Sequence, residues 1–483
     1  MASVRKSLLF SIAGSYITMV LQVVGTLIMA RLLTPEDTGV FAVTSAMIAL
    51  AHNFRDMGVS DYIVQARELT TEKLRAAFTV TLTISWGMAL VIFLGSGQIA
   101  RFYNHEGTGQ IARVLALNYL LIPFGAIGAA YFQRKLDFMP TFLITTVSAI
   151  VGFIVAVALG LAGFGYMSLA WSSVAGVVAS VVISVWLRPK EFPWLPGLKG
   201  CGDMLHFGKH IFFISLAQQA GRSAPDIIVG RMIGITPAGY FSRAGGLSEL
   251  VNRVVLRAIT PVCLPYFAGH AHASSDMKAG YLKAIGFLTV VAWPFYGFLG
   301  IVAYAAIRIF YGDQWVAAVP LAQVLLLAAA VEVTYSFRDE ILISTGNVAK
   351  NSRVVLALQV LRTGLVLAAA PFGLNAVVWA MVVAAFMSGV LSQRTLRLAI
   401  GLHVREFAWA LRTNALITVA TLVPAVIATL AIGATPENYL IFFFGTGTVS
   451  ALTWLLALYL TRHPLWAEIV RSWHSIVGRL RRR

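Results

Sequence analysis

Long apolar segments recur along the chain, and they limit its possible folds more than any other feature. A helix needs about 20 mostly apolar residues to cross the hydrocarbon core of a membrane. Fourteen segments of this 483-residue chain meet that requirement. They lie near residues 8–33, 38–64, 75–98, 110–132, 139–161, 165–187, 207–233, 238–266, 280–308, 318–343, 352–371, 374–396, 409–432 and 439–461. We therefore expect an all-α, polytopic integral membrane protein with about 14 transmembrane helices.

The low charge of the chain supports this fold class and excludes others. Charged residues are 12% of the sequence, whereas a soluble domain carries roughly a quarter. Two cysteines rule out a disulfide scaffold, and the motifs CxxC, HExxH and GxxxxGK(S/T) are absent. A soluble enzyme, a zinc protease and a P-loop ATPase are thereby excluded, and we expect no enzymatic activity. The first apolar segment is too long for the core of a signal peptide, so we expect it to remain in the membrane.

The basic residues between the segments predict the orientation of the chain. If both termini are cytoplasmic, 26 Lys and Arg residues fall in cytoplasmic segments and 3 on the opposite side. The cytoplasmic set includes Arg338, Arg394 and Arg397. Because cytoplasmic loops of membrane proteins are rich in Lys and Arg, this count favours the orientation with both termini inside. It also accounts for most of the net charge of +17, so nucleic acid is not expected as a partner.

One polar connection divides the chain into two halves. The segment RPKEFPWLPGLKGCGD at 188–203 contains three prolines and is the longest polar break between apolar segments. We predict an N-lobe of six helices at 1–187, a cytoplasmic loop at 188–206 and a C-lobe of six helices at 207–396. A further helix pair at 397–461 and a basic tail at 462–483 would complete the chain. The tail either lies on the anionic cytoplasmic leaflet or simply follows the positive-inside pattern.

A weak internal repeat relates the two predicted lobes. Residues 30–41 read ARLLTPEDTGVF, and residues 230–241 read GRMIGITPAGYF. At an offset of 200 residues, Arg31 matches Arg231, Gly39 matches Gly239 and Phe41 matches Phe241. Six predicted spans separate the equivalent helices, so both copies would have the same orientation. Parallel repeats of this kind indicate a two-lobed transporter with a central binding site.

Eight basic residues remain inside the predicted spans, and all of them are arginine. An ionised side chain within a span costs a few kcal/mol, so a set of this size is not incidental. The planar guanidinium pairs bidentately with phosphate, and a cavity lined by it would suit an anionic solute. The eight residues are Arg31, Arg55, Arg222, Arg231, Arg243, Arg253, Arg257 and Arg362.

Some of these arginines have simpler explanations. Arg55 is adjacent to Asp56 near the end of a span, where an interfacial or paired role is sufficient. Arg31 and Arg231 precede short loops and could extend their charge to the membrane surface. Arg222 lies four residues before Asp226, so the two could neutralise each other on one helix face.

Three arginines are harder to neutralise within the predicted spans. Glu249, Arg253 and Arg257 follow one another at intervals of four residues, and one carboxylate cannot neutralise two guanidinium groups. Arg362 is in mid-span with no acidic residue nearby. Arg253, Arg257 and Arg362 are thus the better candidates for a cationic cavity. Arg31, Arg222 and Arg243 complete the predicted set of six.

Three intramembrane carboxylates are candidates for coupling transport to Na⁺ or H⁺. Asp226 and Glu249 have neighbouring arginines, and charge pairing would explain them equally well. Glu332 has no arginine three or four residues away. We expect no metal site and no organic cofactor. Pro225 should also free backbone groups beside Asp226, and we hypothesise that this break is a moving element.

Three sequence motifs resemble those of a known transporter family. The run MARLLTPEDTGVFAVTSAMIALAHNFRDMGVSDYIVQ at 29–65 contains an A-R-L-L-x-P helix end followed by a polar turn and G-hydrophobic-aromatic. A D-x-G-hydrophobic segment follows at 56–59, and YFQRKLDFMP at 131–140 contains a Q-R-basic pattern. Together they are similar to bacterial Wzx-type polysaccharide transporters of the multidrug/oligosaccharidyl-lipid/polysaccharide superfamily. The C-terminal third of the chain matches no motif of this family.

This resemblance implies a specific cargo and location. Wzx-type proteins flip an undecaprenyl-pyrophosphate-linked oligosaccharide across the bacterial inner membrane by alternating access, without ATP hydrolysis. The partners implied are the lipid-linked oligosaccharide, membrane lipid, a glycan polymerase and glycosyltransferases, and we expect the protein to act as a monomer. The motifs do not identify the glycan. Alternatives are a cation-coupled drug exporter, which would need cavity carboxylates, a peptidoglycan-precursor flippase, and an assembly platform without transport activity.

Overall fold

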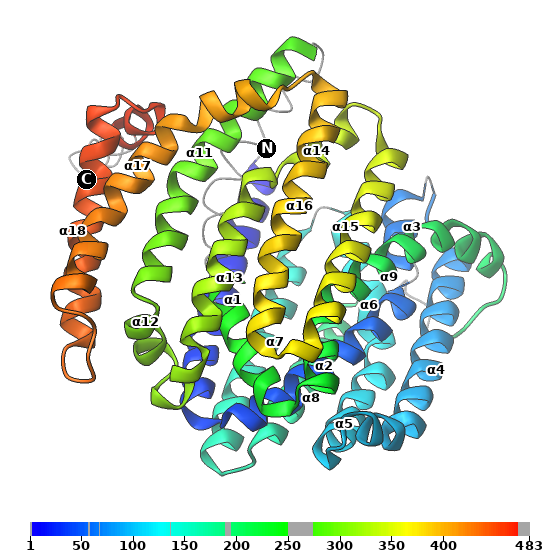
Figure 1. The fold of residues 1–483 in the computed structure, drawn as a ribbon. Coiled ribbons are helices and arrows are strands. Elements are labelled where there is room, and N and C mark those ends of the chain that lie inside the picture. Colours follow the sequence, from blue (N-terminus) through cyan, green and yellow to red (C-terminus); the bar gives the residue numbers. More distant parts are fainter. Residues whose placement is uncertain are drawn as a thin grey trace. The chain divides into compact units, whose positions relative to one another are not determined.

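A computed structural model describes residues 2–56, 58–66, 68–135, 137–188, 195–249 and 274–471. Within these ranges every regular element is helical and no strand occurs. Ten of the described helices are long and apolar enough to cross a membrane, or up to 11 if one bent pair counts as a single span. The prediction of an all-α, multi-pass membrane protein is confirmed. The chain forms two compact units, Met1–Ser242 and Arg243–Arg483 (Figure 1).

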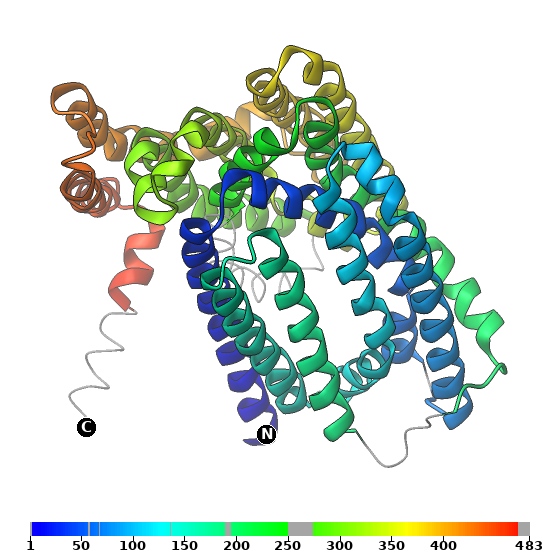
Figure 2. The ribbon, with the colours of Figure 1, turned by 90° about the horizontal axis from the view of Figure 1, so that it is seen from below.

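Unit 1 is a bundle of long helices joined by short turns. Helices α1, α7 and α8 pack side by side, and Figure 2 shows α1 lying along this pair. Helix α9 packs against α2 and α4. The helices are α1 (Ala2–Leu32), α2 (Pro35–Asp56), α3 (Val59–Gln65), α4 (Thr71–Tyr103), α5 (Glu106–Leu121), α6 (Pro123–Arg134), α7 (Phe138–Leu161), α8 (Tyr166–Trp186) and α9 (Cys201–Met232).

Two prolines of unit 1 have different effects on their helices. Pro123 begins α6 directly after α5 has ended, and the two helices are bent by 54°. Proline lacks the backbone N–H needed to continue the ladder, which explains the bend. Helix α9 in contrast continues through Pro225, which is buried. The break that the sequence predicts at Pro225 is therefore absent from the helix as described.

The two segments paired by the internal repeat meet in space. Helix α2 contains Gly39, and residues 235–249, which are also helical, contain Gly239. A Cβ atom on Gly39 would overlap the carbonyl oxygen of Ile235, and one on Gly239 would overlap that of Pro35. Each such Cβ would also lie 3.1 Å from the backbone nitrogen of the other glycine. The approach is reciprocal, and only glycine permits backbones to come this close.

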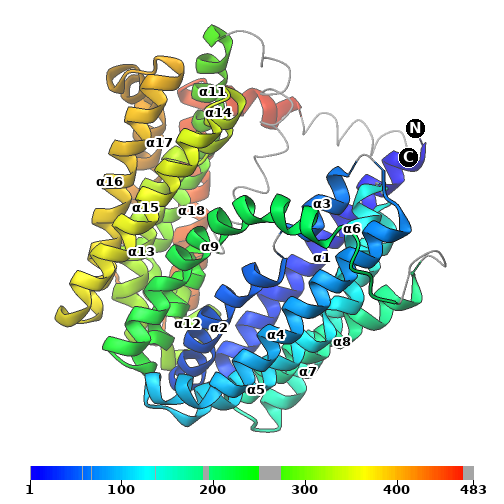
Figure 3. The ribbon, with the colours of Figure 1, turned by 90° about the vertical axis from the view of Figure 1, so that its right-hand side faces the viewer.

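Unit 2 contains long helices that run beside one another, several of them broken (Figure 3). Helix α11 packs against α13 and α17, and α16 packs against α13 and α15. The elements are α11 (Ser274–Ile301), α12 (Ala303–Phe310), η1 (Asp313–Ala318), α13 (Val319–Glu332), η2 (Val333–Tyr335), α14 (Arg338–Ser344), α15 (Val348–Ala369), η3 (Ala370–Phe372), α16 (Leu374–Ile400), α17 (Val404–Ala431) and α18 (Tyr439–Leu460).

The predicted apolar segments coincide with helices in the described residues, although four of them are divided. Of the segment near 238–266, only residues 238–249 are described. The segments near 38–64, 110–132, 280–308 and 318–343 each contain a break between two described helices. At the first of these breaks Gly58 has a left-handed φ of 70°, which ends α2 and allows α3 to start in a new direction. The count of 14 spans and the lobe boundaries at 187, 207 and 396 stay predictions.

Candidate functional site

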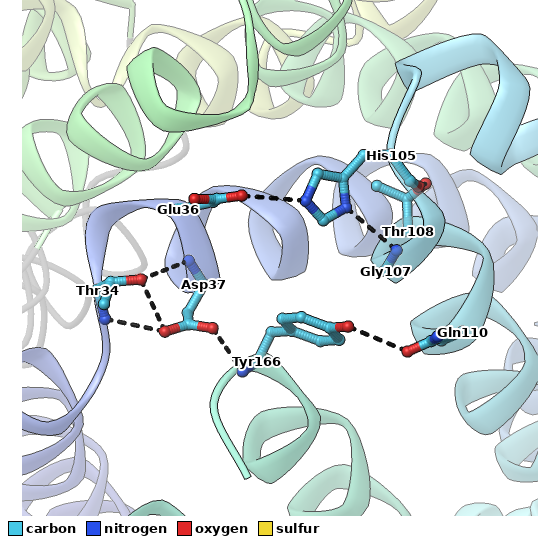
Figure 4. Close-up of polar contacts among 8 residues, drawn as sticks. All are labelled: Thr34, Glu36, Asp37, His105, Gly107, Thr108, Gln110 and Tyr166. Carbon is cyan, nitrogen blue, oxygen red and sulfur yellow. Dashed lines mark hydrogen bonds and ion pairs between the residues drawn. The ribbon is translucent and has the colours of Figure 1, made fainter. Parts of the chain in front are cut away.

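The polar turn of the A-R-L-L-x-P motif caps a helix. The Thr34 backbone N–H and hydroxyl both donate to Asp37 Oδ2, at 3.1 and 2.7 Å, and the Asp37 N–H donates to the Thr34 hydroxyl at 3.1 Å (Figure 4). This reciprocal pattern is a capping box, and Pro35 occupies the first helical position of α2. The motif is thus explained by the start of a helix.

The same turn also connects three helix ends of unit 1. Asp37 Oδ1 accepts a hydrogen bond of 3.0 Å from the backbone N–H of Tyr166, at the start of α8. Glu36 lies 3.2 Å from His105 Nε2, at the start of α5. The Tyr166 hydroxyl lies 3.0 Å from Gln110 Oε1 and donates to it. Figure 4 shows these residues facing one another across the turn, and we call this set the helix-end network.

The second and third motifs also meet in space. Helix α3 begins after Gly58 of the D-x-G motif, and Arg134 comes from the Q-R motif at the end of α6. Arg134 Nη1 donates to the carbonyl oxygens of Ile63, Val64 and Ala66, at 2.9, 3.2 and 2.5 Å. A guanidinium at a helix C-terminus satisfies its free carbonyls and opposes its dipole. Arg134 therefore fixes α3 rather than binding a ligand.

Two of the predicted site residues lie in α9 of unit 1. Arg222 is exposed, and its Nη2 donates to Gln219 Oε1 at 3.1 Å. Gln219 in turn donates to the Ser223 hydroxyl at 3.0 Å. Asp226, half-buried one turn further along, acts electrostatically on the buried Tyr103. Helix α9 thus presents a guanidinium that is held in place by an amide rather than by a salt bridge.

The remaining arginines are divided between the units. Arg31 is exposed in the last turn of α1, and Arg231 stacks on Phe102 with 5.4 Å between the guanidinium carbon and the ring centroid. Arg243 belongs to unit 2, where Tyr311 and Trp315 lie at 5.9 and 5.2 Å. These cation–π contacts give Arg231 and Arg243 structural partners. Arg253, Arg257 and the side chain of Arg55 lie outside the described residues.

Arg362 retains the properties predicted for a cavity residue. It occupies the middle of α15 and is half-buried. Its Nε is buried and has no hydrogen-bond partner among the described residues. Leaving a buried charged donor unpaired is costly, so such a group calls for a hydrogen-bond acceptor, and a bound anion would supply one. Arg362 is the strongest anion-binding candidate in the described part of the chain.

Two predicted coupling carboxylates approach the same tyrosine. Glu249 and Glu332 both act electrostatically on Tyr296, which belongs to α11 and is 2% exposed. Glu332 is the last residue of α13 and is exposed, and Glu249 is exposed in the helix of residues 235–249. These two carboxylates therefore lie within electrostatic range of one buried tyrosine, while Asp226 belongs to unit 1.

A large apolar cavity, which we call the unit 2 groove, lies among α11, α13, α16 and α17. Its volume is about 1010 Å³. Tyr296 and Leu327 contribute to its walls, as do Phe386 and Val390 of α16. Phe386 and Val390 are 56% and 73% exposed, so the groove opens at the surface of unit 2.

Buried polar side chains fix the helices around the groove. Asn414 of α17 donates to the Gly286 carbonyl oxygen and to the Thr289 hydroxyl, both at 2.8 Å, and joins α17 to α11. The Trp293 indole donates to the Ala330 carbonyl oxygen at 3.0 Å and joins α11 to α13. These contacts keep the groove walls in place without filling the space between α16 and α17.

A third buried contact holds α16 at one end of the groove. Arg338, which is 8% exposed, donates from Nη1 to the Ser392 hydroxyl at 2.9 Å and pairs with Asp339 through Nε. The sequence counts Arg338 among the solvated cytoplasmic residues, and the structure corrects this, because the side chain is buried against α16. Gln393 also donates to the Leu402 carbonyl oxygen, at 3.0 Å.

Two arginines that the sequence does not single out lie at this end of the groove. Helix α16 continues past the predicted boundary at 396 and ends at Ile400, where Gly401 has a φ of 66°. Arg394 and Arg397 are therefore helical residues and line the groove. Both are exposed, and neither has a hydrogen-bond or ion-pair partner among the described residues. Their spacing from Phe386 and Val390, along one helix face, is the signal that could have identified them.

Comparison with known proteins now places the chain in a family. A model of the family described as "Polysaccharide biosynthesis protein" matches residues 28–320, more than half of the chain. The chain belongs to this polysaccharide biosynthesis family. The resemblance seen in the three sequence motifs is thereby confirmed. The match ends before α16 and α17, so the arginine end of the unit 2 groove lies beyond it.

Curated members related to this chain are named for several polysaccharides. The teichuronic acid biosynthesis protein TuaB of Bacillus subtilis is 24% identical over 340 residues, 68% of each protein. The succinoglycan biosynthesis transport protein ExoT of Rhizobium meliloti is 24% identical over 336 residues, 68% of this chain and 67% of the relative. The lipopolysaccharide biosynthesis protein WzxC of Escherichia coli is 21% identical over 62% of this chain and 61% of the relative.

Solved structures with the same fold are membrane transporters. The lipid II flippase MurJ, in an inward closed conformation, has a TM-score of 0.76 and 14% identity, and the likeness covers 95% of this chain and 99% of MurJ. An inward-facing multidrug resistance MATE family transporter of the MOP superfamily has a TM-score of 0.60 and 16% identity, covering 79% of this chain and 95% of that transporter. At these identities the likeness establishes the fold.

Proposed function

We propose that this protein flips a polyprenyl-pyrophosphate-linked oligosaccharide repeat unit across the bacterial inner membrane for surface polysaccharide biosynthesis. Membership of the polysaccharide biosynthesis family supports the glycan part of the cargo. The relatives named for succinoglycan transport and lipopolysaccharide biosynthesis support export of a repeat unit. The carrier lipid is undecaprenyl pyrophosphate in this proposal.

The main support for an anionic cargo is the guanidinium of Arg362. It is half-buried in an apolar helix, and its Nε has no partner among the described residues. A pyrophosphate bears several acceptor oxygens and would supply that partner bidentately. Arg222 on α9, and Arg253 and Arg257 outside the described residues, would add positive charge along the path of the cargo.

The proposal includes a topology and a transport cycle. Fourteen spans in two six-helix lobes plus two C-terminal helices would alternate access between the leaflets, with both termini cytoplasmic and no catalytic step. Support comes from the overlap of each predicted segment with described helix and from the positive-inside count. The protein would act as a monomer, receiving cargo from glycosyltransferases and delivering it to a polymerase.

Coupling to Na⁺ or H⁺ belongs to the same proposal. Glu249 and Glu332 would hold the ion, supported by their shared proximity to Tyr296. Carboxylates within a span are expensive and commonly mark ion paths. Asp226 would instead serve charge balance near Arg222 on α9.

Complementation of a flippase-null strain tests the function. Arg362→Ala should reduce surface glycan at least tenfold and leave the repeat unit on its carrier at the inner leaflet, because the anion loses its charge partner. Arg353→Ala is a matched control, since it removes an exposed arginine near the start of the same helix. Normal surface glycan from Arg362→Ala, at wild-type protein levels, would refute the charge assignment. Failure of the wild-type protein to restore any of a panel of surface glycans would refute the function itself.

A further inference from the structure

The unit 2 groove is apolar along its length and basic at one end. Leu327, Phe386 and Val390 contribute exposed apolar surface, at 45%, 56% and 73% of their side chains. Arg394 and Arg397 line one end and have no partner among the described residues. A surface with a basic end and a long apolar wall is complementary to an amphiphile with an anionic head.

The lining of the groove extends from Arg397 and Val404 at one end to Gly300 and Gln323 at the other. The part beside the arginines corresponds to one leaflet of a membrane. From Phe386 to Arg397, α16 rises by about 16 Å at 1.5 Å per residue. Half of a hydrocarbon core of about 30 Å is about 15 Å. An acyl chain entering from the arginine end would therefore reach Phe386 and the apolar groups beside it without crossing into the opposite leaflet.

The arginine end also contains a buried amide that is incompletely bonded. Gln393 is 6% exposed and lines the groove, and its Nε2 donates to the Leu402 carbonyl oxygen. Its Oε1 is buried and has no donor among the described residues. An unpaired buried acceptor next to two unpaired cations is consistent with a polar headgroup that completes this end of the groove.

We propose that the unit 2 groove binds one anionic phospholipid, with its phosphate between Arg394 and Arg397 and an acyl chain along α16. Basic pockets between transmembrane helices at the cytoplasmic side are suited to anionic lipid heads. The predicted topology puts this end at the cytoplasmic leaflet, where such lipids are abundant. The inference does not depend on which glycan is carried.

The chemistry of the groove argues against an oligosaccharide as its occupant. An oligosaccharide needs many hydrogen-bonding groups, whereas the walls beyond Gln393 and the two arginines are mainly aliphatic and aromatic. A polyprenyl carrier would also suit an apolar wall, and a competition experiment distinguishes it from a phospholipid. A bound lipid would fill the space between α16 and α17. Arg338 joins α16 to α14, and Asn414 joins α17 to α11, so neither contact closes this space.

Lipid binding to the purified full-length protein tests the proposal. Dioleoyl phosphatidylglycerol and dioleoyl phosphatidylcholine would each be titrated into the detergent-solubilised protein, and bound lipid counted by native mass spectrometry. We expect one phosphatidylglycerol to bind at least tenfold more tightly than phosphatidylcholine. Arg394→Gln/Arg397→Gln should abolish that preference. Both lipids carry a phosphate, but phosphatidylcholine adds a choline cation that the two arginines repel, so the preference for the net anionic head depends on their charge.

Two further variants make the test specific. Arg353→Gln/Arg405→Gln removes two exposed arginines outside the groove and should keep the preference. Val390→Trp fills the groove from an exposed position and should weaken both lipids while the protein stays folded. Equal binding of the two lipids by the wild-type protein, or an unchanged preference in the Arg394→Gln/Arg397→Gln variant, would overturn the proposal.

A competition arm separates this site from the proposed function. Undecaprenyl phosphate, added to the wild-type protein loaded with phosphatidylglycerol, should leave the bound phospholipid in place. Its displacement at equal concentration would reassign the groove to the carrier lipid and overturn the phospholipid site. Because the assay measures no transport, its result is independent of whether the protein restores glycan in cells.

Discussion

The helix-end network of unit 1 and the arginine end of the unit 2 groove are both polar, but they are built in opposite ways. In the network, Thr34, Asp37 and Tyr166 satisfy one another over 2.7 to 3.1 Å. In the groove, Arg394 and Arg397 have no partner among the described residues. The first arrangement is complete without a ligand, and the second is complementary to one.

The residues of the three sequence motifs belong to the first type of arrangement. The family match covers 28–320 and includes the helix-end network, Gly39 and Arg134. All of these residues hold helix ends or backbones together. Arg394 and Arg397 lie past the end of the match. Motif residues in this protein therefore report how the scaffold is fixed, and binding groups have to be located from the structure.

The largest effect should come from closing the tightest contact of unit 1. Gly39→Ala introduces a Cβ that overlaps the Ile235 carbonyl oxygen, which is backbone and cannot rotate away. We expect a loss of about 3 kcal/mol or more and little folded protein, measured by monodisperse yield and thermal unfolding. Gly95→Ala, where a Cβ would meet nothing within 4 Å, is the control. Equal yields from the two variants would contradict the reciprocal backbone contact.

Unit 2 also contains a polar contact whose groups satisfy one another. It tests whether such contacts stabilise the protein in either unit. Asn414→Ala removes two hydrogen bonds between α17 and α11 and leaves the buried Thr289 hydroxyl without its donor. We expect a loss of about 2 kcal/mol in the free energy of unfolding. Leu416→Ala, at a 67% exposed position on the same helix, should change it by less than half as much. Similar losses would mean that Asn414 does not join the helices.

A smaller effect is expected in the helix-end network itself. Asp37→Ala removes the cap of α2 and the bond to Tyr166, and should cost about 1–2 kcal/mol, seen as a lower thermal midpoint. Its neighbour Glu36 contacts His105 with a side chain that is 62% exposed. Glu36→Ala should therefore change stability by less than about 1 kcal/mol. A larger loss from Glu36→Ala than from Asp37→Ala would reverse this order.

The smallest intrinsic effect is expected at the open end of the groove. In phosphatidylcholine, Arg394→Gln/Arg397→Gln should shift the free energy of unfolding by no more than about 0.5 kcal/mol, because both side chains are exposed. Added phosphatidylglycerol should raise the thermal midpoint of the wild-type protein and not that of the variant, because a ligand stabilises only the state that binds it. A strong loss in phosphatidylcholine would show that the arginines are part of the scaffold.

The helical segments could be predicted because each needs only length and apolar composition, and these are local properties. The positions where helices break or end were harder to predict from the sequence. Pro123 bends its span whereas α9 continues through Pro225, and nothing in the two local sequences distinguishes these outcomes. Arg394, just inside the predicted segment 374–396, and Arg397, just past its end, were counted only as cytoplasmic charges. Helix α16 continues to Ile400, and both residues line the groove.

The binding roles of the candidate residues stay predictions, and only some of their contacts could be foreseen from the sequence. Arg362 could be singled out because no acidic residue is near it in sequence, and its Nε also lacks a partner among the described residues. Arg338 and Arg134 could not be interpreted, since their partners on α16 and α3 are more than 50 residues away along the chain. The shared position of Glu249 and Glu332 near Tyr296 likewise depends on three separate helices.

The reciprocal contact of Gly39 and Gly239 has a mechanical consequence. With no side chain between the two backbones, the helices cannot be pushed closer here, and any rotation of one helix against the other would turn about this contact. Gly39 lies near one end of α2, and the far end at Asp56 is about 25 Å away. A pivot of about 10° would swing that end by about 4 Å, so a small rotation at two glycines becomes a displacement of nearly one helix turn.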